Sequence, residues 1–375
     1  MTEDLVRQLD GNTFVLSEEN GDIDASPSYP TGLFSFDTRF LSRWLLSIDG
    51  ERLSPLTVDE VEYFETRFVL VRGVPAPLSD PDISVIRERA VDGSLREQLT
   101  VINHTAQPID VRVRVEAGSD FADLLEIKET RPKKGTLYAR VDNGCLLLGY
   151  QRETFRRETV ISSTVAARVD EQGLTYDVRI APHSDWGTEL RVRTLGADGL
   201  DLREALQGRP SRVRTEMRRD LDRRLADAPR LQCDWEPLTM TYRRSLVDLA
   251  ALRFVPLTGA GQSLPAAGLP WFMCIFGRDS IFTSLQALPF APDLAATTLR
   301  MLTLTQGTVL DDFREEEPGK IMHELRYGET VGFGEQPQSP YYGSADATPL
   351  FVILLDEYER WTGDADAVRA CQGAA

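Results

Sequence analysis

The sequence predicts a multidomain β plus α protein, in which an antiparallel β-sandwich precedes a series of α-helices. Short runs of alternating apolar and polar residues, separated by turn dipeptides, extend from about Asn12 to Leu195. A stretch rich in Arg, Glu, Asp and Leu follows over Leu202–Ala228, and helical spacing begins near Trp235. We therefore assign residues 1–200 to the sandwich, residues 201–231 to a helical linker and residues 232–375 to a helical domain.

The clearest strand pair is a hairpin. Ile83–Ala90 and Leu95–Ile102 flank Asp92-Gly93, and a glycine there tolerates the positive φ that a two-residue turn requires. Further strands are predicted at Thr66–Val71, Ile109–Glu116, Leu137–Val141, Leu146–Gln151, Thr159–Val169, Leu174–Ile180 and Thr188–Val192. So many short strands in succession favour a sandwich.

The helical part shows several amphipathic segments. Tyr242, Leu246 and Leu249 share one face of a first helix. Others are predicted from about Asp279-Ser280 to Leu288, and over Leu294–Thr305, Asp346–Trp361 and Asp364–Cys371. Asp279 or Ser280 is expected to cap the second of these helices.

Charge and composition narrow the range of partners. The 42 Lys and Arg against 59 Asp and Glu leave a net charge of −17, which repels phosphate backbones and anionic lipid but not a neutral sugar. We therefore expect no nucleic-acid and no membrane partner. The four cysteines show no metal-ligand spacing, and the N-terminus lacks a signal-peptide pattern, so a cytoplasmic protein is expected.

The segment Gly268–Leu288 holds residues that core packing would not require. Trp271 and Phe272 precede Gly277-Arg278-Asp279-Ser280 at a predicted helix start. A sugar ring stacks on aromatic side chains, and its hydroxyls need both donors and acceptors. This combination indicates a sugar pocket, whereas a local Arg-Asp ion pair with a helix cap is the structural alternative.

Two later clusters add polar side chains. The carboxylate-rich segment Asp311–Glu324, which includes His323 and continues to Glu329, fits a catalytic acid, a cation site or merely solvated loop charge. Tyr341–Pro349 fits a pocket rim, or a plain helix start capped by Ser344 or Asp346. No nucleophile elbow, phosphate loop or zinc-protease motif is present, so carboxylate chemistry without a metal or cofactor is expected.

Together these segments resemble the bacterial and archaeal glycogen-debranching (amylo-α-1,6-glucosidase-like) family. Gly32–Ser42 is similar to the family's N-terminal signature, and Pro318–Glu329 and Tyr341–Pro349 are similar to its catalytic-domain motifs. The resemblance implies a sandwich joined to an (α/α)6 toroid of six-hairpin glycosidase type, which is incomplete in this chain. It also implies a substrate-binding set: Arg278, Asp279, Trp271, Phe272, His323, Glu324, Tyr341, Tyr342 and Asp346.

The resemblance further implies an inverting reaction on α-glucosidic linkages of glycogen-like glucans, with α-1,6 linkages as the expected type. Two carboxylates perform such a reaction, an acid and a base. The family's positions for both are expected beyond Ala375, so no catalytic residue is assigned. A hydrolase of a small α-glucoside such as glucosylglycerate and a non-catalytic glucan-binding fragment are the rival interpretations.

Overall fold

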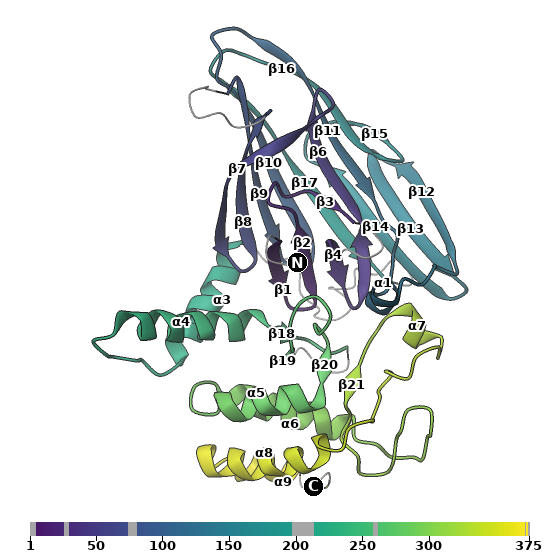
Figure 1. Ribbon diagram of the computed structural model, residues 1–375, viewed down its shortest axis with the longest axis vertical. Coiled ribbons are helices and arrows are strands. Elements are labelled where there is room, and N and C mark those ends of the chain that lie inside the picture. Colours follow the sequence, from purple (N-terminus) through teal and green to yellow (C-terminus); the bar gives the residue numbers. More distant parts are fainter. Residues whose placement is uncertain are drawn as a thin grey trace. The chain divides into compact units, whose positions relative to one another are not determined.

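The computed structural model describes residues 5–25, 30–73, 81–196, 214–257, 262–371 and 373. The chain divides into two compact units, Met1–Arg212 and Val213–Ala375. The first unit is built mainly of strands and the second mainly of helices (Figure 1). The predicted class, a β-rich part followed by helices, is therefore confirmed. The first half of the predicted linker helix, up to residue 213, lies outside the described residues.

The described strands of the first unit form two antiparallel sheets and are joined by one short helix. The strands are β1 (Val6–Asp10), β2 (Thr13–Ser17), β3 (Ile23–Asp24), β4 (Gly32–Ser35), β5 (Thr38–Leu41), β6 (Arg43–Ile48), β7 (Glu51–Glu62), β8 (Glu65–Arg72), β9 (Ile83–Val91), β10 (Leu95–Asn103), β11 (Ile109–Gly118), β12 (Thr136–Asp142), β13 (Cys145–Arg152), β14 (Phe155–Ser163), β15 (Arg168–Asp170), β16 (Gly173–Ile180) and β17 (Asp185–Leu195). Helix α1 (Leu124–Glu129) follows β11.

The larger sheet has the strand order β12-β13-β14-β17-β10-β9-β8-β7-β6-β11-β16-β15, with β3 beside β6. Strand β7 pairs with β6 at its start and with β8 along the rest of its length, so it links two halves of this sheet. The two halves form facing layers (Figure 1). The smaller sheet has the order β1-β2-β4-β5.

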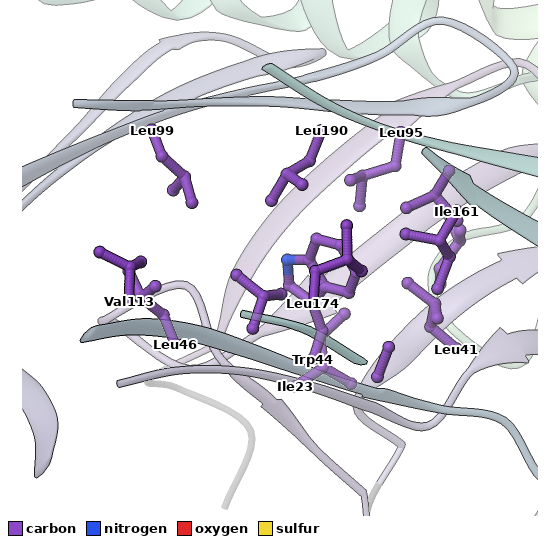
Figure 2. Close-up of a cluster of buried hydrophobic side chains, with 14 of the residues drawn as sticks. Ile23, Leu41, Trp44, Leu46, Leu95, Leu99, Val113, Ile161, Leu174 and Leu190 are labelled. Atoms are coloured by element: carbon purple, nitrogen blue, oxygen red, sulfur yellow. The ribbon is translucent and has the colours of Figure 1, made fainter. Parts of the chain in front are cut away.

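The core of the first unit lies between these layers. Burial alternates along β9, β10 and β11, as expected for strands with one face in a core. Figure 2 shows Leu99 and Leu190 from one layer pointing toward Val113 from the other, with Trp44 among them. Burial of these apolar side chains is the main favourable contribution to folding of this unit.

One cluster of charges interrupts this apolar core. Arg87, Arg89 and Glu97 occupy inward positions of β9 and β10 and are fully buried. Arg87 donates to Glu97 Oε1 at 2.9 Å and to Asp22 Oδ1 at 2.7 Å, and Arg89 Nε donates to Glu97 Oε2 at 2.7 Å. The indole of Trp44 donates to Glu97 Oε1 at 3.1 Å. Both oxygens of the buried carboxylate are therefore bonded to donors.

Electrostatics in this cluster favour the ionised form of Glu97. Burial alone would raise the pKa of the Glu97 carboxyl, but the charges and hydrogen bonds of Arg87 and Arg89 outweigh it and hold that pKa below its ordinary value. A buried pair of this kind is costly to break, because the remaining partner keeps an uncompensated charge in a medium of low polarity.

The predicted strands are found with two corrections. The predicted hairpin joins β9 to β10, and Gly93 has a φ of 82°, but the two-residue turn is wrong because three residues, Asp92 to Ser94, lie between the paired Val91 and Leu95. The predicted strand Thr159–Val169 is wrong as a single element, because the chain bends after Ser163 and continues in β15. Strand β14 pairs with β13 and β17, whereas β15 pairs with β16, so the two pieces lie in different parts of the sheet.

The second unit contains helices α3 to α9 and four short strands. The elements are α3 (Arg214–Asp227), α4 (Glu236–Ala251), β18 (Arg253–Phe254), β19 (Leu264–Pro265), β20 (Ile275–Phe276), α5 (Gly277–Ala287), α6 (Pro292–Leu304), β21 (Glu324–Leu325), α7 (Glu329–Gly332), α8 (Ala347–Thr362) and α9 (Ala365–Cys371). Helices α5, α6 and α8 pack against one another. None of the helices in the described part of the chain is long and apolar enough to cross a membrane.

The predicted helices agree with α5, α6, α8 and α9 to within about two residues at each end. The predicted cap of α5 is wrong. This helix follows directly from β20, its N-cap residue is Phe276, and no side chain caps it. Ser280 lies in the first turn, is buried, and donates to the carbonyl of Pro265 at 2.8 Å.

The buried charge cluster yields a stability prediction. Replacing Glu97 by Gln removes the negative charge that Arg87 and Arg89 share, so we expect a loss of about 3 to 5 kcal/mol in the free energy of unfolding. Glu88→Gln is the matched control, since Glu88 pairs at 2.7 Å with the half-exposed Arg67 and should contribute under about 1 kcal/mol. Urea unfolding of the 375-residue chain, followed by circular dichroism, measures both.

Acidification provides a second readout of the same variant. Because the pKa of Glu97 is lowered on folding, its contribution to stability is complete above the unfolded-state value of about 4.3 and is lost as the pH falls through the lower folded-state pKa. The difference between wild type and Glu97→Gln should therefore narrow below about pH 4.3. Equal unfolding midpoints of the Glu97 and Glu88 variants at pH 7 would contradict this view of the cluster.

Candidate functional site

Three segments far apart in the sequence meet at one backbone junction in the second unit. Strand β20 pairs with β21, so that Phe276 lies opposite Glu324. Tyr341 forms a bridge to Glu324 on the other side, with its amide donating to the Glu324 carbonyl at 2.9 Å. The His323 amide donates to the Tyr341 carbonyl at 2.7 Å. The three predicted clusters are therefore brought together.

A glycine allows this junction to close. The amide of Gly277 donates to the His323 carbonyl at 2.9 Å. A Cβ at this position would lie 2.0 Å from the carbonyl oxygen of Met322, closer than two nonbonded atoms can approach. Glycine is required here for the close approach of two backbones, and helix α5 starts at this contact.

Arg278 pairs across the junction with the start of α8. Its Nη1 donates to Asp346 Oδ2 at 3.0 Å, and the two side chains remain 45% and 42% exposed. Ser344 donates to the other oxygen of Asp346. The hydrogen bond from Ser344 is the largest effect on the pKa of Asp346 and lowers it. Desolvation opposes this effect, and the hydrogen bond and charge of Arg278 add to it, so the pKa of this carboxyl lies below its ordinary value.

The local Arg278-Asp279 ion pair considered from the sequence does not form, since Arg278 is paired with Asp346 instead. Asp279 lies half-buried in the first turn of α5, and its carboxylate accepts no hydrogen bond from any described residue. The remaining donors of Arg278, Nε and Nη2, likewise bind no group within the described part of the chain. The site thus presents unused donors beside an unused acceptor.

Aromatic rings form a row beside these groups. Phe272, which is 44% exposed, contacts Phe276 edge-to-face with ring centroids 5.8 Å apart. The row continues from Phe276 to His323 at 5.7 Å and from His323 to Tyr341 at 6.0 Å. Trp271 is half-buried. The exposed ring of Phe272 can therefore serve as an apolar platform, whereas Phe276 supports it from below.

Arg326 ties Trp271 to the junction. Its Nη2 donates to the Trp271 carbonyl at 2.7 Å, its Nε bonds to the Glu324 carboxylate, and its guanidinium lies 5.9 Å from the Phe276 ring. Glu324 is therefore neutralised by a buried arginine. This arrangement makes Glu324 a positioning group for the loop that carries Trp271.

The two tyrosines have different environments. Tyr341 is half-buried and donates to Glu315 Oε1 at 2.9 Å, and this bond, followed by desolvation, raises the pKa of its phenol. Tyr342 is buried and donates to the Thr305 carbonyl at 2.9 Å, and its burial raises the pKa of the phenol to about 12. Contact of Tyr342 with substrate stays a prediction that this inward placement does not favour.

Sequence reasoning did not predict three side-chain contacts of the site, although Ser344 was a candidate helix cap and Glu315 and Arg326 lie in the carboxylate-rich segment named above. Glu315 orients Tyr341, Ser344 orients Asp346 and also accepts the Ala347 amide at 3.3 Å, and Arg326 holds Trp271. The close approach at Gly277 was also missed. The glycine just before Arg278 was the one available signal, because glycine is unfavourable inside a helix and needs a reason there. No group of three His, Cys, Asp or Glu in the described residues is arranged to hold a metal ion.

A known protein family matches the sequence of the first unit. Residues 9–191, just under half of the chain, match the family model described as the N-terminal domain of (some) glycogen debranching enzymes. This chain carries that N-terminal domain. The resemblance drawn from Gly32–Ser42 is thereby confirmed for the first unit. No curated protein sequence matches the chain.

Among solved structures, a protein from the human microbiome described as a kojibiose phosphorylase aligns with 96% of this chain, at 9% identity and a TM-score of 0.53. At that identity the similarity concerns the fold alone. This chain spans 54% of that structure's length. An aldose 1-epimerase-like protein from Escherichia coli K12 covers 51% of this chain and 99% of its own, at 8% identity and a TM-score of 0.32. A polysaccharide lyase covers 54% and 34%, at 11% identity and a TM-score of 0.29. Scores this low carry no argument about this chain.

The junction at Gly277 yields a second prediction. Gly277→Ala places a methyl group against the Met322 carbonyl, so we expect a loss of about 1 to 3 kcal/mol in stability, as for overpacking, and faster hydrogen exchange of the Glu324 amide. Gly332→Ala is the matched control, because a Cβ there meets no atom within 4 Å. If both variants melt and exchange like wild type, the glycine does not hold the three segments together.

Proposed function

We propose that this chain supplies the substrate-binding part of a glycoside hydrolase that acts on α-glucosidic linkages, of the α-1,6 type, in glycogen-like glucans. One observation carries the proposal: the open Arg278–Asp346 pair, the unbonded Asp279 carboxylate and the exposed Phe272 ring all belong to segments that meet at one junction. The debranching-type N-terminal domain in the same chain supports the choice of substrate.

The chemistry of these groups suits a terminal glucose. Each sugar hydroxyl is both donor and acceptor, so neighbouring hydroxyls are best bound by a guanidinium and a carboxylate side by side. The C–H face of the ring needs an apolar surface, which Phe272 and Trp271 provide. Because Arg278 and Asp346 are already paired, the arginine is oriented before the sugar arrives and little side-chain entropy remains to be lost.

We further propose that α3 belongs to the helical linker and that α4 to α9 belong to an (α/α)6 toroid, in which the predicted binding residues face the substrate. In this proposal Arg278 and Asp279 bind hydroxyls of the terminal glucose and transfer no proton. Inversion requires a catalytic acid and base roughly 6.5 to 9.5 Å apart, and neither is assigned to a residue of this chain. A cytoplasmic location and the absence of nucleic-acid and membrane partners are part of the same proposal.

Three other activities remain as alternatives within this site. The fold shared with a protein described as a kojibiose phosphorylase favours phosphorolysis as one of them. The others are hydrolysis of a small α-glucoside such as glucosylglycerate, and glucan binding without catalysis. Assay of the complete reading frame that contains residues 1–375, with and without inorganic phosphate, on limit dextrin and on small glucosides, separates them.

The binding half of the proposal can be tested on the 375-residue chain itself. Arg278→Ala removes the unpaired donors and should weaken binding of isomaltose by about ten- to a hundredfold, the effect of losing one or two hydrogen bonds to a charged group. Titration calorimetry measures the change. Arg243→Ala, an exposed arginine of α4, is the matched control and should bind like wild type.

Equal affinity of the Arg278 and Arg243 variants would contradict the proposed role of Arg278. Absence of any isomaltose binding by the wild-type chain at millimolar ligand would contradict the claim that the binding half is formed within these residues.

A further inference from the structure

The hairpin β4–β5 is a part of the first unit that the proposed function does not use. Its turn is formed by Phe36 and Asp37, with φ of 46° and 64°. Two non-glycine residues in the left-handed region are unfavourable, so contacts from elsewhere must hold them. The amide of Leu124 donates to the Asp37 carbonyl at 2.9 Å, and that of Arg39 donates to the Ala122 carbonyl at 2.9 Å. The hairpin is thus fixed to the start of α1.

A cavity of about 330 Å³ lies at this contact. Its polar wall is made mainly by Arg39, Asp120, Glu126 and Lys133, with Thr130 and Arg131 beside them, and its apolar wall includes Ile127 and Pro132. Ligand sites commonly have this form, with apolar surface and a few convergent polar groups, and a volume of roughly 300 Å³ or more. All of the lining residues belong to the first unit.

Two ion pairs make up the polar wall. Arg39 is only 2% exposed, and its Nε donates to Asp120 Oδ1 at 3.0 Å. Lys133 Nζ lies 2.9 Å from Glu126 Oε2 and 4.3 Å from the centre of the Tyr150 ring. A third lining cation, Arg131, pairs with Glu129 outside the lining, so each cation of the wall has an anionic partner. An ionic ligand of either sign would meet a like charge, whereas a neutral ligand would not.

Only one of the two carboxylate oxygens of Glu126 accepts hydrogen bonds from described residues. Its Oε2 accepts the Asp123 amide at 2.8 Å and the Lys133 ammonium, whereas no described residue donates to Oε1. The Glu126 side chain is 4% exposed. Burial raises the pKa of this carboxyl, and Lys133 partly opposes the rise. Oε1 therefore keeps its lone pairs available to a hydroxyl group that enters the cavity.

We propose that this cavity is a second carbohydrate site, in which Glu126 Oε1 and the Arg39–Asp120 pair bind neighbouring hydroxyls of a glucan chain while Ile127 and Pro132 contact its C–H face. The first unit would then hold a glucan near the enzyme independently of the helical unit. The choice of a glucan among polyhydroxylated ligands rests on the proposed function. The polar character of the cavity is independent of the proposed function.

The test is calorimetric titration of the 375-residue chain with maltoheptaose, in an Arg278→Ala background that removes the site in the second unit. We expect this background to retain one binding site. Adding Glu126→Gln should weaken that site at least tenfold, because the amide offers fewer acceptor lone pairs and no charge. The amide still accepts the Asp123 amide proton, so α1 keeps its capping interaction.

A second variant tests the space inside the cavity independently of the charge of Glu126. Ala122→Leu, a buried residue on the cavity wall, should fill the space and abolish binding while leaving the ion pairs in place. Lys128→Ala, an exposed residue of α1 outside the cavity, is the matched control and should bind like the background. A circular-dichroism melt for each variant shows that the unit is folded.

The outcomes distinguish the two proposals. Maltoheptaose binding that survives Arg278→Ala but is lost in Glu126→Gln and Ala122→Leu supports the second site, even if Arg278 has no effect on isomaltose. A background that binds no maltoheptaose overturns the second site, and so does full affinity of the folded Glu126→Gln and Ala122→Leu variants.

Discussion

The close contact between Gly277 and the Met322 carbonyl is the constraint on which the candidate site depends. It allows β20 to lie against β21, and the bridge from Glu324 to Tyr341 then adds the third segment. Without a backbone junction, Arg278 and Asp346 would belong to separate helix starts and would share no substrate. The hydrogen bonds of Ser344 and Arg326 refine the site, but the backbone sets the distances within which they operate.

In the first unit, the main constraint is the burial of charged side chains in an apolar core. Its core accepts Arg87, Arg89 and Glu97 among apolar side chains, because both arginines bind the Glu97 carboxylate and Arg87 also binds Asp22. A similar principle operates at the proposed second site, where Arg39 and Glu126 are buried in pairs. The difference is that one oxygen of Glu126 has no donor among the described residues, and Glu126 lines a cavity.

The sequence predicted the elements better than their contacts. Alternation identified strands β8 to β14, β16 and β17 but placed none of β1 to β7, and helical spacing identified α5, α6, α8 and α9, because both signals are local. The bend after Ser163 was missed, since nothing in the β-branched run around it indicates a change of partner strand. The partners of Arg278 and Tyr341 were missed for another reason. Asp346 and Glu315 lie far from them in the chain, and spacing alone assigned Arg278 to its neighbour Asp279.

The central claim is that three distant segments form one sugar-binding surface, and hydrogen exchange of the backbone amides with and without isomaltose tests it most directly. Added sugar should slow exchange together in residues 268–280, 321–326 and 339–346, because all three segments meet at the junction. Protection confined to one of these segments, or found only elsewhere in the chain while calorimetry shows binding, would contradict the claim.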